Sequence, residues 1–380
     1  MNAGARRRVI YLSGTRADFG LMRTTLQRIA AHRMDLQVLV TGAHLSTEHG
    51  GTVEEIRASG LPICAQVPMD MRTRSGASMA LGLADCLRGA TEVLARERPD
   101  MLLVLGDRGE MLAGAIAALH LGIPCIHIHG GERSGTVDEP MRHAISKLST
   151  YHLVATAGSQ ARLLAMGEPP SRIHVVGAPG LDGLAELGAM PRDACLAALG
   201  LAPDTRFVLA MFHPVVQQAG QAGAQALALL QALQAVALPV FWLEPNADAG
   251  ALEVLKALDQ FSLPGGSRRA AHLPRPLFAA ALRHAEVLAG NSSAGIIEAA
   301  SFGTPVVNIG DRQRLRERNA NVRDVDVDAI TIEAALRDAL GRGHGPWENV
   351  YGDGKAGERI AALLERLDLG PALLEKTNTY

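Results

Sequence analysis

Short apolar runs alternate along the chain with longer segments in which apolar residues recur at helical spacing. In the first half, the apolar runs predict strands at Val9–Ser13, Leu36–Val40, Met101–Gly106, Cys125–His129 and Tyr151–Thr156. The intervening segments predict helices at Phe19–Ala31, Thr52–Ser59, Ser78–Arg98, Glu110–Leu121 and Glu139–Ser149. Strands this apolar are typically buried on both faces, as in a parallel sheet covered by helices. The alternation therefore predicts a doubly wound α/β domain.

The same alternation begins again after a boundary near Gly177–Leu184. Strands are expected within the runs Phe207–Phe212, Pro239–Pro245, Ala285–Ser293 and Thr304–Gly310. We therefore predict a first domain at residues 1–180 and a second doubly wound domain at residues 181–354. Residues 355–380 contain a predicted helix that is expected to pack back on the first domain. Two such domains facing each other would leave a cleft at the carboxyl ends of their strands, where open α/β sheets bind ligands.

Composition and charge narrow the class of protein. A chain of 380 residues with 48% hydrophobic and 20% charged residues is typical of a soluble protein with two domains. Lys and Arg number 37 against 39 for Asp and Glu, so no overall field attracts nucleic acid or a membrane surface. No apolar run is long enough for a signal peptide or a membrane span. The four cysteines are scattered, which favours free thiols and a cytoplasmic location.

Polar residues gather where the predicted strands end. In "SGTRADFG", Gly14 allows a tight turn, and Arg16 with the amides of the next helix can face an anion. The alternative is an ordinary turn with a surface arginine. In "GDRGE", Asp107 is placed either to cap the following helix or to act as an acid or base.

The densest cluster is "HIHGGERSGTVDEPMRHAISK", which follows the strand ending at His129. Because side chains alternate along a strand, His127 and His129 are expected on the same side. Gly130–Gly131 lets the backbone approach a ligand closely. Ionisable side chains follow at Glu132, Asp138, Arg142 and His143.

Three interpretations of this cluster stay open. Asp138, Arg142 and Ser146 share one helix face if the helix begins by Asp138, and the side chains then form either a reactive site or a helix cap with solvated ion pairs. A zinc site is the third interpretation, but neither a cysteine nor an HExxH motif accompanies the histidines. So many titratable groups beside one strand end favour catalysis.

The second domain carries a different set of groups at its strand ends. His213 ends the first strand in "FHPV", and "GNSSAGIIEAASFGTPVVNIGDRQ" follows a later one. The latter stretch offers hydroxyls and amides at a helix start, then a carboxylate suited to a ribose diol, then an arginine. These residues are Ser292, Ser293, Gly295, Glu298 and Arg312. The pattern indicates a nucleotide-diphosphate site; the alternative is a capped helix with solvated charges.

These motifs, together with "GDRGEMLAGAIAA" and "EPNADAG", occur in the order found in hydrolysing UDP-N-acetylglucosamine 2-epimerases. The chain resembles that family from about residue 8 to residue 365. The resemblance implies a glycosyltransferase-B-like fold of two Rossmann-like domains facing across a cleft. It also implies that a UDP-sugar and water yield UDP and the free 2-epimeric sugar without cofactor or metal. A homodimer or homotetramer is expected.

The resemblance also implies roles for individual residues. Those expected to bind UDP or the substrate are Arg16, His44, Arg108, His213, Ser292, Ser293, Gly295, Glu298 and Arg312. Those expected to be catalytic are Asp107, His129, Glu132, Asp138 and Arg142. Family members that serve sialic acid synthesis usually have Glu at the position of His129. Histidine there is frequent in relatives that act on UDP-2,4-diacetamido-2,4,6-trideoxyhexoses, which lead to legionaminic-type acids.

The reaction explains why charge crowds at one strand end. A weakly acidic C2 proton must be removed, UDP expelled from C1, and the resulting glycal hydrated, which requires positioned proton-transfer groups and donors for the departing diphosphate. We therefore expect conversion of UDP-GlcNAc to N-acetylmannosamine, with the 2,4-diacetamido sugar as the alternative substrate. Further alternatives are a glycosyltransferase, a non-hydrolysing 2-epimerase and an inactive UDP-sugar sensor.

Overall fold

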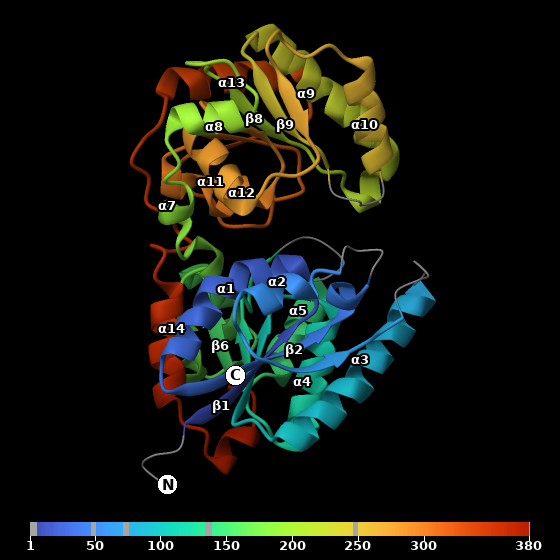
Figure 1. Cartoon of the computed structure of the whole chain (residues 1–380), viewed down its shortest axis with the longest axis vertical. Helices are drawn as coiled ribbons and strands as arrows, with labels where there is room; N and C mark the ends of the chain where they lie inside the picture. Colours follow the sequence, from blue (N-terminus) through green and yellow to red (C-terminus); the bar gives the residue numbers. More distant parts are fainter. Residues whose placement is uncertain (1–5, 47–50, 71–75, 134–138, 246–249, 380) are drawn as a thin grey trace. The chain divides into compact units, whose positions relative to one another are not determined.

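The computed structural model describes residues 6–46, 51–70, 76–133, 139–245 and 250–379. It divides into two compact units, one formed by residues 1–182 with 351–380 and the other by residues 183–350. We call them unit 1 and unit 2 (Figure 1). Within the described ranges, no helix is long and apolar enough to cross a membrane.

Unit 1 is built on a parallel sheet with the strand order β3-β2-β1-β4-β5-β6-β7. The strands are β1 (Arg7–Ser13), β2 (Met34–Thr41), β3 (Ile63–Val67), β4 (Met101–Leu105), β5 (Cys125–Ile128), β6 (Tyr151–Val154) and β7 (Ile173–Val175). The strand order reverses between β1 and β4. After β1 the chain adds strands toward one edge of the sheet, and after β4 it adds them toward the other edge. Open α/β sheets bind ligands at the carboxyl ends of such strands.

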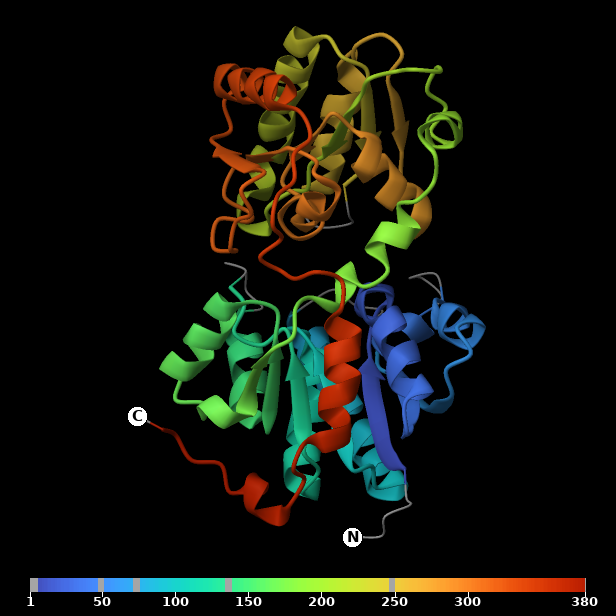
Figure 2. The same cartoon turned by 90° about the vertical axis from the view of Figure 1, so that its left-hand side faces the viewer.

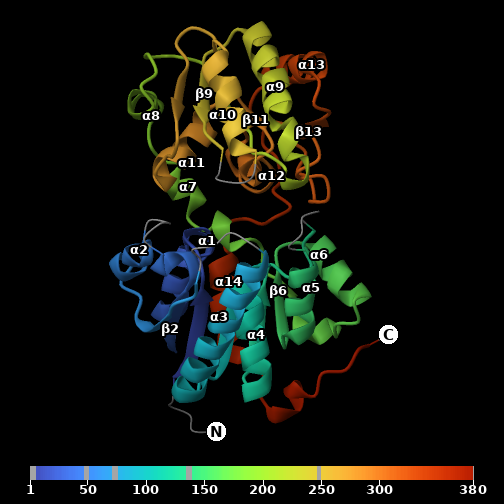
Figure 3. The same ribbon diagram turned by 90° about the vertical axis from the view of Figure 1, so that its right-hand side faces the viewer.

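Helices cover both faces of this sheet (Figures 2 and 3). They are α1 (Arg16–Ala31), α2 (Val53–Ala58), α3 (Gly76–Glu97), α4 (Gly109–Leu121), α5 (Glu139–Leu148), α6 (Ala157–Ala165) and α14 (Ala356–Arg366). Local sequence explains their ends: Thr15 and Asp18 form a capping box at the start of α1, and Gly122 ends α4 with φ 65°. One core lies under α1, α2 and α14, and another under α3, α4 and α5.

Helix α14 belongs to unit 1 although it follows unit 2 in the sequence. Its Ile360 and Leu364 are fully buried in the same core as Met22 and Leu26 of α1. Figure 2 shows α14 in red beside α1 in blue. Burying one such side chain contributes roughly 1.5–3 kcal/mol, so α14 is an integral part of this core.

Unit 2 repeats the architecture with the strand order β10-β9-β8-β11-β12-β13, all pairs parallel. Its strands are β8 (Val208–Met211), β9 (Val240–Leu243), β10 (Arg268–Ala270), β11 (Val287–Gly290), β12 (Val306–Ile309) and β13 (Val322–Val325). Its helices are α7 (Leu184–Leu187), α8 (Arg192–Ala198), α9 (Ala222–Val236), α10 (Ala251–Gln260), α11 (Arg275–His284), α12 (Ser293–Ile297) and α13 (Ala329–Arg342). The order reverses between β8 and β11. The predicted fold class, two doubly wound α/β domains, is confirmed.

Candidate active site

The loop after β1 is held by a buried polar network. Ser13 Oγ donates to Asp18 Oδ1 at 2.5 Å and lies 2.9 Å from Nε2 of His44. The other ring nitrogen of His44 lies 2.8 Å from Thr52 Oγ1. Burial raises the pKa of Asp18, and the hydrogen bonds from Ser13 and Thr15 oppose that shift. Burial lowers the pKa of His44. His44, expected to bind substrate, is fully buried here, and its ring contacts support this loop.

Arg16, by contrast, is accessible. It is the first residue of α1, its side chain is 52% exposed, and its Nε lies 2.8 Å from Glu55 Oε1. An ion pair this exposed contributes little stability, so the guanidinium can exchange Glu55 for an anionic ligand at small cost.

The turn after β4 presents Asp107. Gly106 has φ 79°, which glycine tolerates, and α4 begins after Arg108, whose side chain makes no capping bond. Asp107 is therefore not the cap of α4. Its carboxylate, 22% exposed, accepts a hydrogen bond from Arg142 of α5. Arg108 pairs with the buried Glu110 at 3.2 Å and keeps a half-exposed side chain.

His127 lies inside the sheet and fixes the geometry of this turn. Its Nε2 is 2.7 Å from the carbonyl oxygen of Gly106, and its Nδ1 is 3.0 Å from Ser146 Oγ. A carbonyl can only accept, so Nε2 carries the proton and Nδ1 accepts from Ser146. Burial lowers the pKa of His127 to about 3, so the ring is neutral near pH 7.

The prediction that His129 shares a side with His127 rested on a strand that includes both residues. Strand β5 ends at Ile128, and His129 has φ 63°, so the alternation of a strand does not extend to it. Its Nδ1 lies 3.0 Å from Glu132 Oε1 instead. A positive φ is uncommon for a residue with a Cβ, and such strained positions cluster at functional sites.

The two glycines that follow are required by close contacts. A Cβ on Gly130 would lie 2.9 Å from His127 Nδ1, and one on Gly131, with φ 72°, would lie 2.4 Å from the backbone oxygen of Ser159. Arg162 of α6 donates from Nε to the carbonyl of Gly131. The double glycine thus brings the chain against β5 and α6.

Arg142 is the centre of the charged cluster in unit 1. Its side chain is almost fully buried, pairs with Asp107, and has Nη1 3.8 Å from Glu132 Oε2. Together with the contact between Glu132 and His129, this links four predicted catalytic residues in one cluster. The fifth, Asp138, lies outside the described residues, as does its predicted alignment with Arg142 and Ser146.

In unit 2 the turns after β8 and β11 are joined by one amide side chain. Asn291 Oδ1 accepts from the backbone N–H of His213 at 2.7 Å, and Asn291 Nδ2 donates to the His213 carbonyl at 2.8 Å. Gly290 passes so close to β8 that a Cβ there would lie 1.9 Å from the oxygen of Met211. Arg312 and Gln313 donate to the carbonyl of Asn291 at 3.1 and 3.0 Å.

The other predicted nucleotide-binding residues surround α12. The hydroxyl of Ser292 caps this helix, while Ser293 is its first residue. A Cβ on Gly295 would lie 2.6 Å from Leu288 Cδ2, so this glycine lets α12 pack on the sheet. Glu298 is paired with Nη1 of Arg275 at 2.7 Å. Burial raises the pKa of Glu298, and Arg275 opposes that shift.

Sequence reasoning missed three residues that support the site: Asn291, Arg275 and Arg162. Asn291 was visible beside the serines, but its role depends on a partner 78 positions away. Arg162 contacts Gly131 in unit 1 and Arg275 contacts Glu298 in unit 2. Both arginines come from helices whose sequences carry no distinctive motif, so no local signal marks them.

Within the described ranges, no group of three His, Cys, Asp or Glu side chains is arranged to hold a metal ion.

Comparison with known proteins places the chain in a family. The family model for UDP-N-acetylglucosamine 2-epimerase matches residues 27–365. A hydrolysing UDP-N,N'-diacetylbacillosamine 2-epimerase from Legionella pneumophila is 47% identical over 375 residues, which cover 98% of this chain and 100% of that protein. A UDP-N-acetylglucosamine 2-epimerase from Neisseria meningitidis is 32% identical over 366 residues, which cover 94% of this chain and 95% of that protein.

Solved structures show the same fold. The crystal structure of the UDP-GlcNAc 2-epimerase from Neisseria meningitidis bound to UDP-GlcNAc has a TM-score of 0.79 at 18% identity. The alignment covers 95% of this chain and 100% of that one. The resemblance seen in the sequence is therefore confirmed, and the chain belongs to the hydrolysing UDP-N-acetylglucosamine 2-epimerase family of enzymes, with a glycosyltransferase-B-like fold.

Proposed function

We propose that this enzyme converts a UDP-2,4-diacetamido-2,4,6-trideoxyglucose and water to UDP and the free 2-epimeric sugar. The observation that carries the proposal is the 47% identity, over nearly the whole chain, to a relative named for UDP-N,N'-diacetylbacillosamine, a sugar of this kind. His129 supports it, because the sequence places His where relatives of the sialic acid pathway carry Glu.

The reaction has two stages with a glycal between them. A base takes the C2 proton while the C1–O bond breaks and UDP leaves with the bonding electrons. Water then adds its oxygen at C1, and a proton returns to C2 on the opposite face, which inverts that centre. Both stages need groups that hold and release protons at fixed positions.

The charged cluster of unit 1 supplies candidates for these proton transfers. Asp107 is the part-exposed carboxylate, and Arg142 holds it in place. Nε of Arg142 is buried and has no hydrogen-bond partner among the described residues, so it keeps a donor for a ligand or a neighbouring carboxylate. Asp107, His129 and Glu132 are proposed to share the proton transfers with Asp138.

His129 is proposed to face the sugar. Its Nδ1 is engaged by Glu132, while its Nε2 has no hydrogen-bond partner within the described ranges. An imidazole nitrogen can donate or accept, and it adds no negative charge beside Asp107. Two roles follow: proton transfer in place of the usual Glu, or a contact that selects the 4-acetamido-6-deoxy sugar.

The strand-end loops of unit 2 are proposed to bind the UDP moiety. Ser292 and Ser293 offer hydroxyls, Arg312 a cation for the diphosphate, and Glu298 a carboxylate for the ribose hydroxyls. The ion pair between Glu298 and the part-exposed Arg275 keeps that carboxylate in place.

The second candidate substrate is UDP-GlcNAc. It is favoured by the relative from Neisseria meningitidis, which is 32% identical over 94% of this chain and is named for that sugar. The two candidates differ only at C4 and C6, so the same loops can serve either reaction.

The test is incubation of the enzyme with each UDP-sugar and identification of the products by NMR. We expect free 2-epimeric sugar and UDP, with the higher kcat/KM on the diacetamido substrate. A UDP-linked epimer as the final product would contradict hydrolysis. UDP binding without turnover of either sugar would indicate a sensor. Undiminished UDP release after chelator treatment is the expected result for an enzyme without an essential metal.

The role of His129 is tested with His129→Ala and His129→Glu on both sugars. A proton-transfer role requires His129→Ala to lose activity on both, by about tenfold or more. A selectivity role requires the ratio of the two kcat/KM values to change, most in His129→Glu. His32→Ala is the matched control, because His32 is a part-exposed histidine paired with Glu365 on the surface. Wild-type rates and ratios in both variants would remove His129 from the site.

A further inference from the structure

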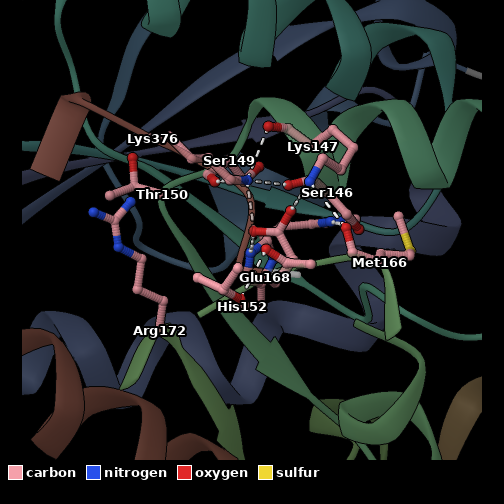
Figure 4. Close-up of polar contacts among 12 residues, drawn as sticks. Ser146, Lys147, Ser149, Thr150, His152, Met166, Glu168, Arg172 and Lys376 are labelled. Atoms are coloured by element: carbon pink, nitrogen blue, oxygen red, sulfur yellow. Dashed lines mark hydrogen bonds and ion pairs between the residues drawn. The ribbon is translucent and has the colours of Figure 1, made fainter. Parts of the chain in front are cut away.

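A lysine from the segment after α14 is inserted into unit 1 beside α5. The side chain of Lys376 is only 16% exposed, and its Nζ lies 2.6 Å from Glu168 Oε2. The same nitrogen donates to the carbonyl oxygens of Ser146, Lys147 and Ser149 at 3.0, 2.8 and 2.8 Å (Figure 4). The ammonium thus has four acceptors around it.

The three carbonyls belong to the C-terminal end of α5 and the residue that follows it. The last carbonyls of a helix have no partner within the helix, and a cation is favourable there because it opposes the negative end of the helix dipole. Lys376 meets both needs from a position 230 residues away from Ser146 in the sequence. The end of α5 is therefore held by the C-terminal segment of the chain.

Glu168 makes this arrangement possible. It is fully buried, accepts a hydrogen bond from His152 Nε2 at 2.8 Å, and forms ion pairs with Lys147 Nζ at 2.8 Å and with Lys376 Nζ. Burial alone would raise the pKa of Glu168, but these bonds hold it at about 2, so the carboxylate stays charged. A buried ammonium is costly without such a partner.

Further bonds dock the segment on both sides of Lys376. Arg172 Nη1 donates to the carbonyl of Leu373 at 3.0 Å, and the backbone N–H of Thr379 donates to the carbonyl of Gly167 at 3.0 Å. Lys147 Nζ also reaches Asn378 Oδ1 at 2.5 Å. The segment from Leu373 to Thr379 is therefore bound along its length, which fixes where Lys376 enters.

Helix α5 connects this anchor to the charged cluster. It carries Arg142, which pairs with Asp107, and one turn later Ser146. Ser146 Oγ donates to His127, and His127 donates to the carbonyl of Gly106, the residue before Asp107. Both partners in the Asp107–Arg142 pair thus depend on where α5 lies.

We propose that Lys376 is a positioning residue for the reaction: by holding the end of α5, it sets the geometry in which Arg142 and the Asp107 turn meet. The inference rests on the proposed function, which assigns Asp107 and Arg142 to the chemistry. Misplacement of a reacting group by about 1 Å can cost on the order of a hundredfold in rate, so a small shift of α5 is enough to matter.

The main test is Lys376→Met, which keeps the length of the side chain and removes the ammonium. We expect kcat to fall by about tenfold or more while KM stays within about twofold, because the loops proposed to bind UDP belong to unit 2, and Arg16 and Arg108, expected to bind from unit 1, do not lie on α5. Lys147→Met is the matched variant: it removes the other ammonium on Glu168 and the bond to Asn378, but it leaves the three carbonyl bonds of Lys376 in place. Its kcat should stay within about threefold of wild type.

A second variant tests the same link with Lys376 in place. Ser146→Ala removes the bond to His127 and should lower kcat with little change in KM. The double variant Lys376→Met/Ser146→Ala should lose less than the product of the two single losses, as expected for residues in one network. Lys256→Met, at an exposed lysine paired only with Glu253 in the structure's described part, should leave kcat and KM unchanged.

A readout without substrate separates this proposal from the proposed function. In wild type, the imidazole nitrogen signals of His127 should show a protonated Nε2 and an unprotonated Nδ1, and Lys376→Met should shift or broaden them. If the variant shifts the His127 signals but the wild-type enzyme turns over neither UDP-sugar, the proposed function is refuted. The structural connection from Lys376 through α5 to His127 is then still supported. Unchanged His127 signals with a kcat within twofold of wild type, or equal losses in Lys376→Met and Lys147→Met, would overturn the positioning role.

Discussion

The strand-end loops of the two units hold their polar groups in different ways. In unit 1, charged side chains from separate elements contact one another, with Arg142 of α5 between Asp107 and Glu132. In unit 2, Asn291 and Arg312 bond mainly to backbone groups of the loops themselves.

This difference suits different tasks. Paired ionisable side chains can exchange protons with a ligand, whereas loops braced through their backbone present fixed donors. Substitutions in unit 1 should therefore change turnover, and substitutions in unit 2 should change affinity for UDP.

The largest effect is expected from Asp107→Asn, which keeps the shape of the side chain and removes the ionisable group. Turnover should fall by about a hundredfold or more, the usual scale for loss of an acid–base group, while UDP affinity by calorimetric titration stays near wild type. Asp338→Asn, at an exposed aspartate paired with Arg323, is the control. Near-normal turnover of Asp107→Asn would contradict the assignment of turnover to unit 1 and of UDP affinity to unit 2.

The next effect is on the pH dependence of stability in unit 1. Burial lowers the folded pKa of His127 to about 3, against an ordinary value of 6.5. Between these pH values the unfolded state binds a proton that the folded state does not. The stability that the folded protein gains from keeping His127 neutral is therefore fully present above pH 6.5 and is lost as the pH falls. The loss is about 1.4 kcal/mol per pH unit, or roughly 2 kcal/mol at pH 5.

Urea unfolding at pH 7 and pH 5 measures this effect, with His127→Gln as the comparison. The variant should lose less stability than wild type between the two pH values, because Gln does not titrate. Equal losses in the two proteins would mean that His127 is not the group responsible.

In unit 2 the larger effect is expected from Asn291→Ala. Asn291 is 2% exposed, and its loss leaves the backbone N–H and carbonyl of His213 without their side-chain partner. An unsatisfied buried group costs about 1–3 kcal/mol, so UDP affinity should weaken by about tenfold through distortion of both turns. Titration of UDP into the folded variant measures it, and kcat at saturating substrate should change less than affinity.

The smallest effect is expected from Glu298→Ala. Loss of hydrogen bonds to the ribose hydroxyls should cost about 1 kcal/mol, a roughly fivefold weaker UDP complex. Arg275→Ala should weaken binding by no more than this, because Arg275 acts through Glu298. Unchanged UDP affinity of the Glu298 variant would remove this carboxylate from the nucleotide site.

The sequence predicts the central strands better than the edges of the sheets. β4 and β11 are buried on both faces and read as continuous apolar runs. The edge strands β3, β10 and β13 are not singled out, because half of their positions or more contact solvent and carry mixed side chains, as in "RRA" of β10. An edge strand has one neighbour and only partial cover, so its sequence is less constrained.

The candidate site shows the same limit. Local motifs locate Asp107, His129 and Glu132, because each follows an apolar strand. They do not predict that Arg142, 35 positions away, pairs with Asp107 instead of joining a solvated helix face. Nor does the alternation of side chains along a strand predict where His129 points, because β5 ends at Ile128 and the backbone of His129 has a positive φ. Pairing across elements and backbone conformation after a strand are set by packing, which periodicity does not contain.

The position of α14 bears on how the chain folds as it is made. Unit 2 is continuous from residue 183 to residue 350, whereas unit 1 needs Ile360 and Leu364 to complete the core under α1. Domains begin to fold as they emerge during synthesis, from the N-terminal side onward. Here unit 2 is complete once residue 350 has been made, before α14 is synthesised. The strands of unit 1, although made first, stay incompletely covered until α14 has been made. Unit 1 is therefore the part that most needs protection from aggregation on the ribosome, although its strands are the first to be translated.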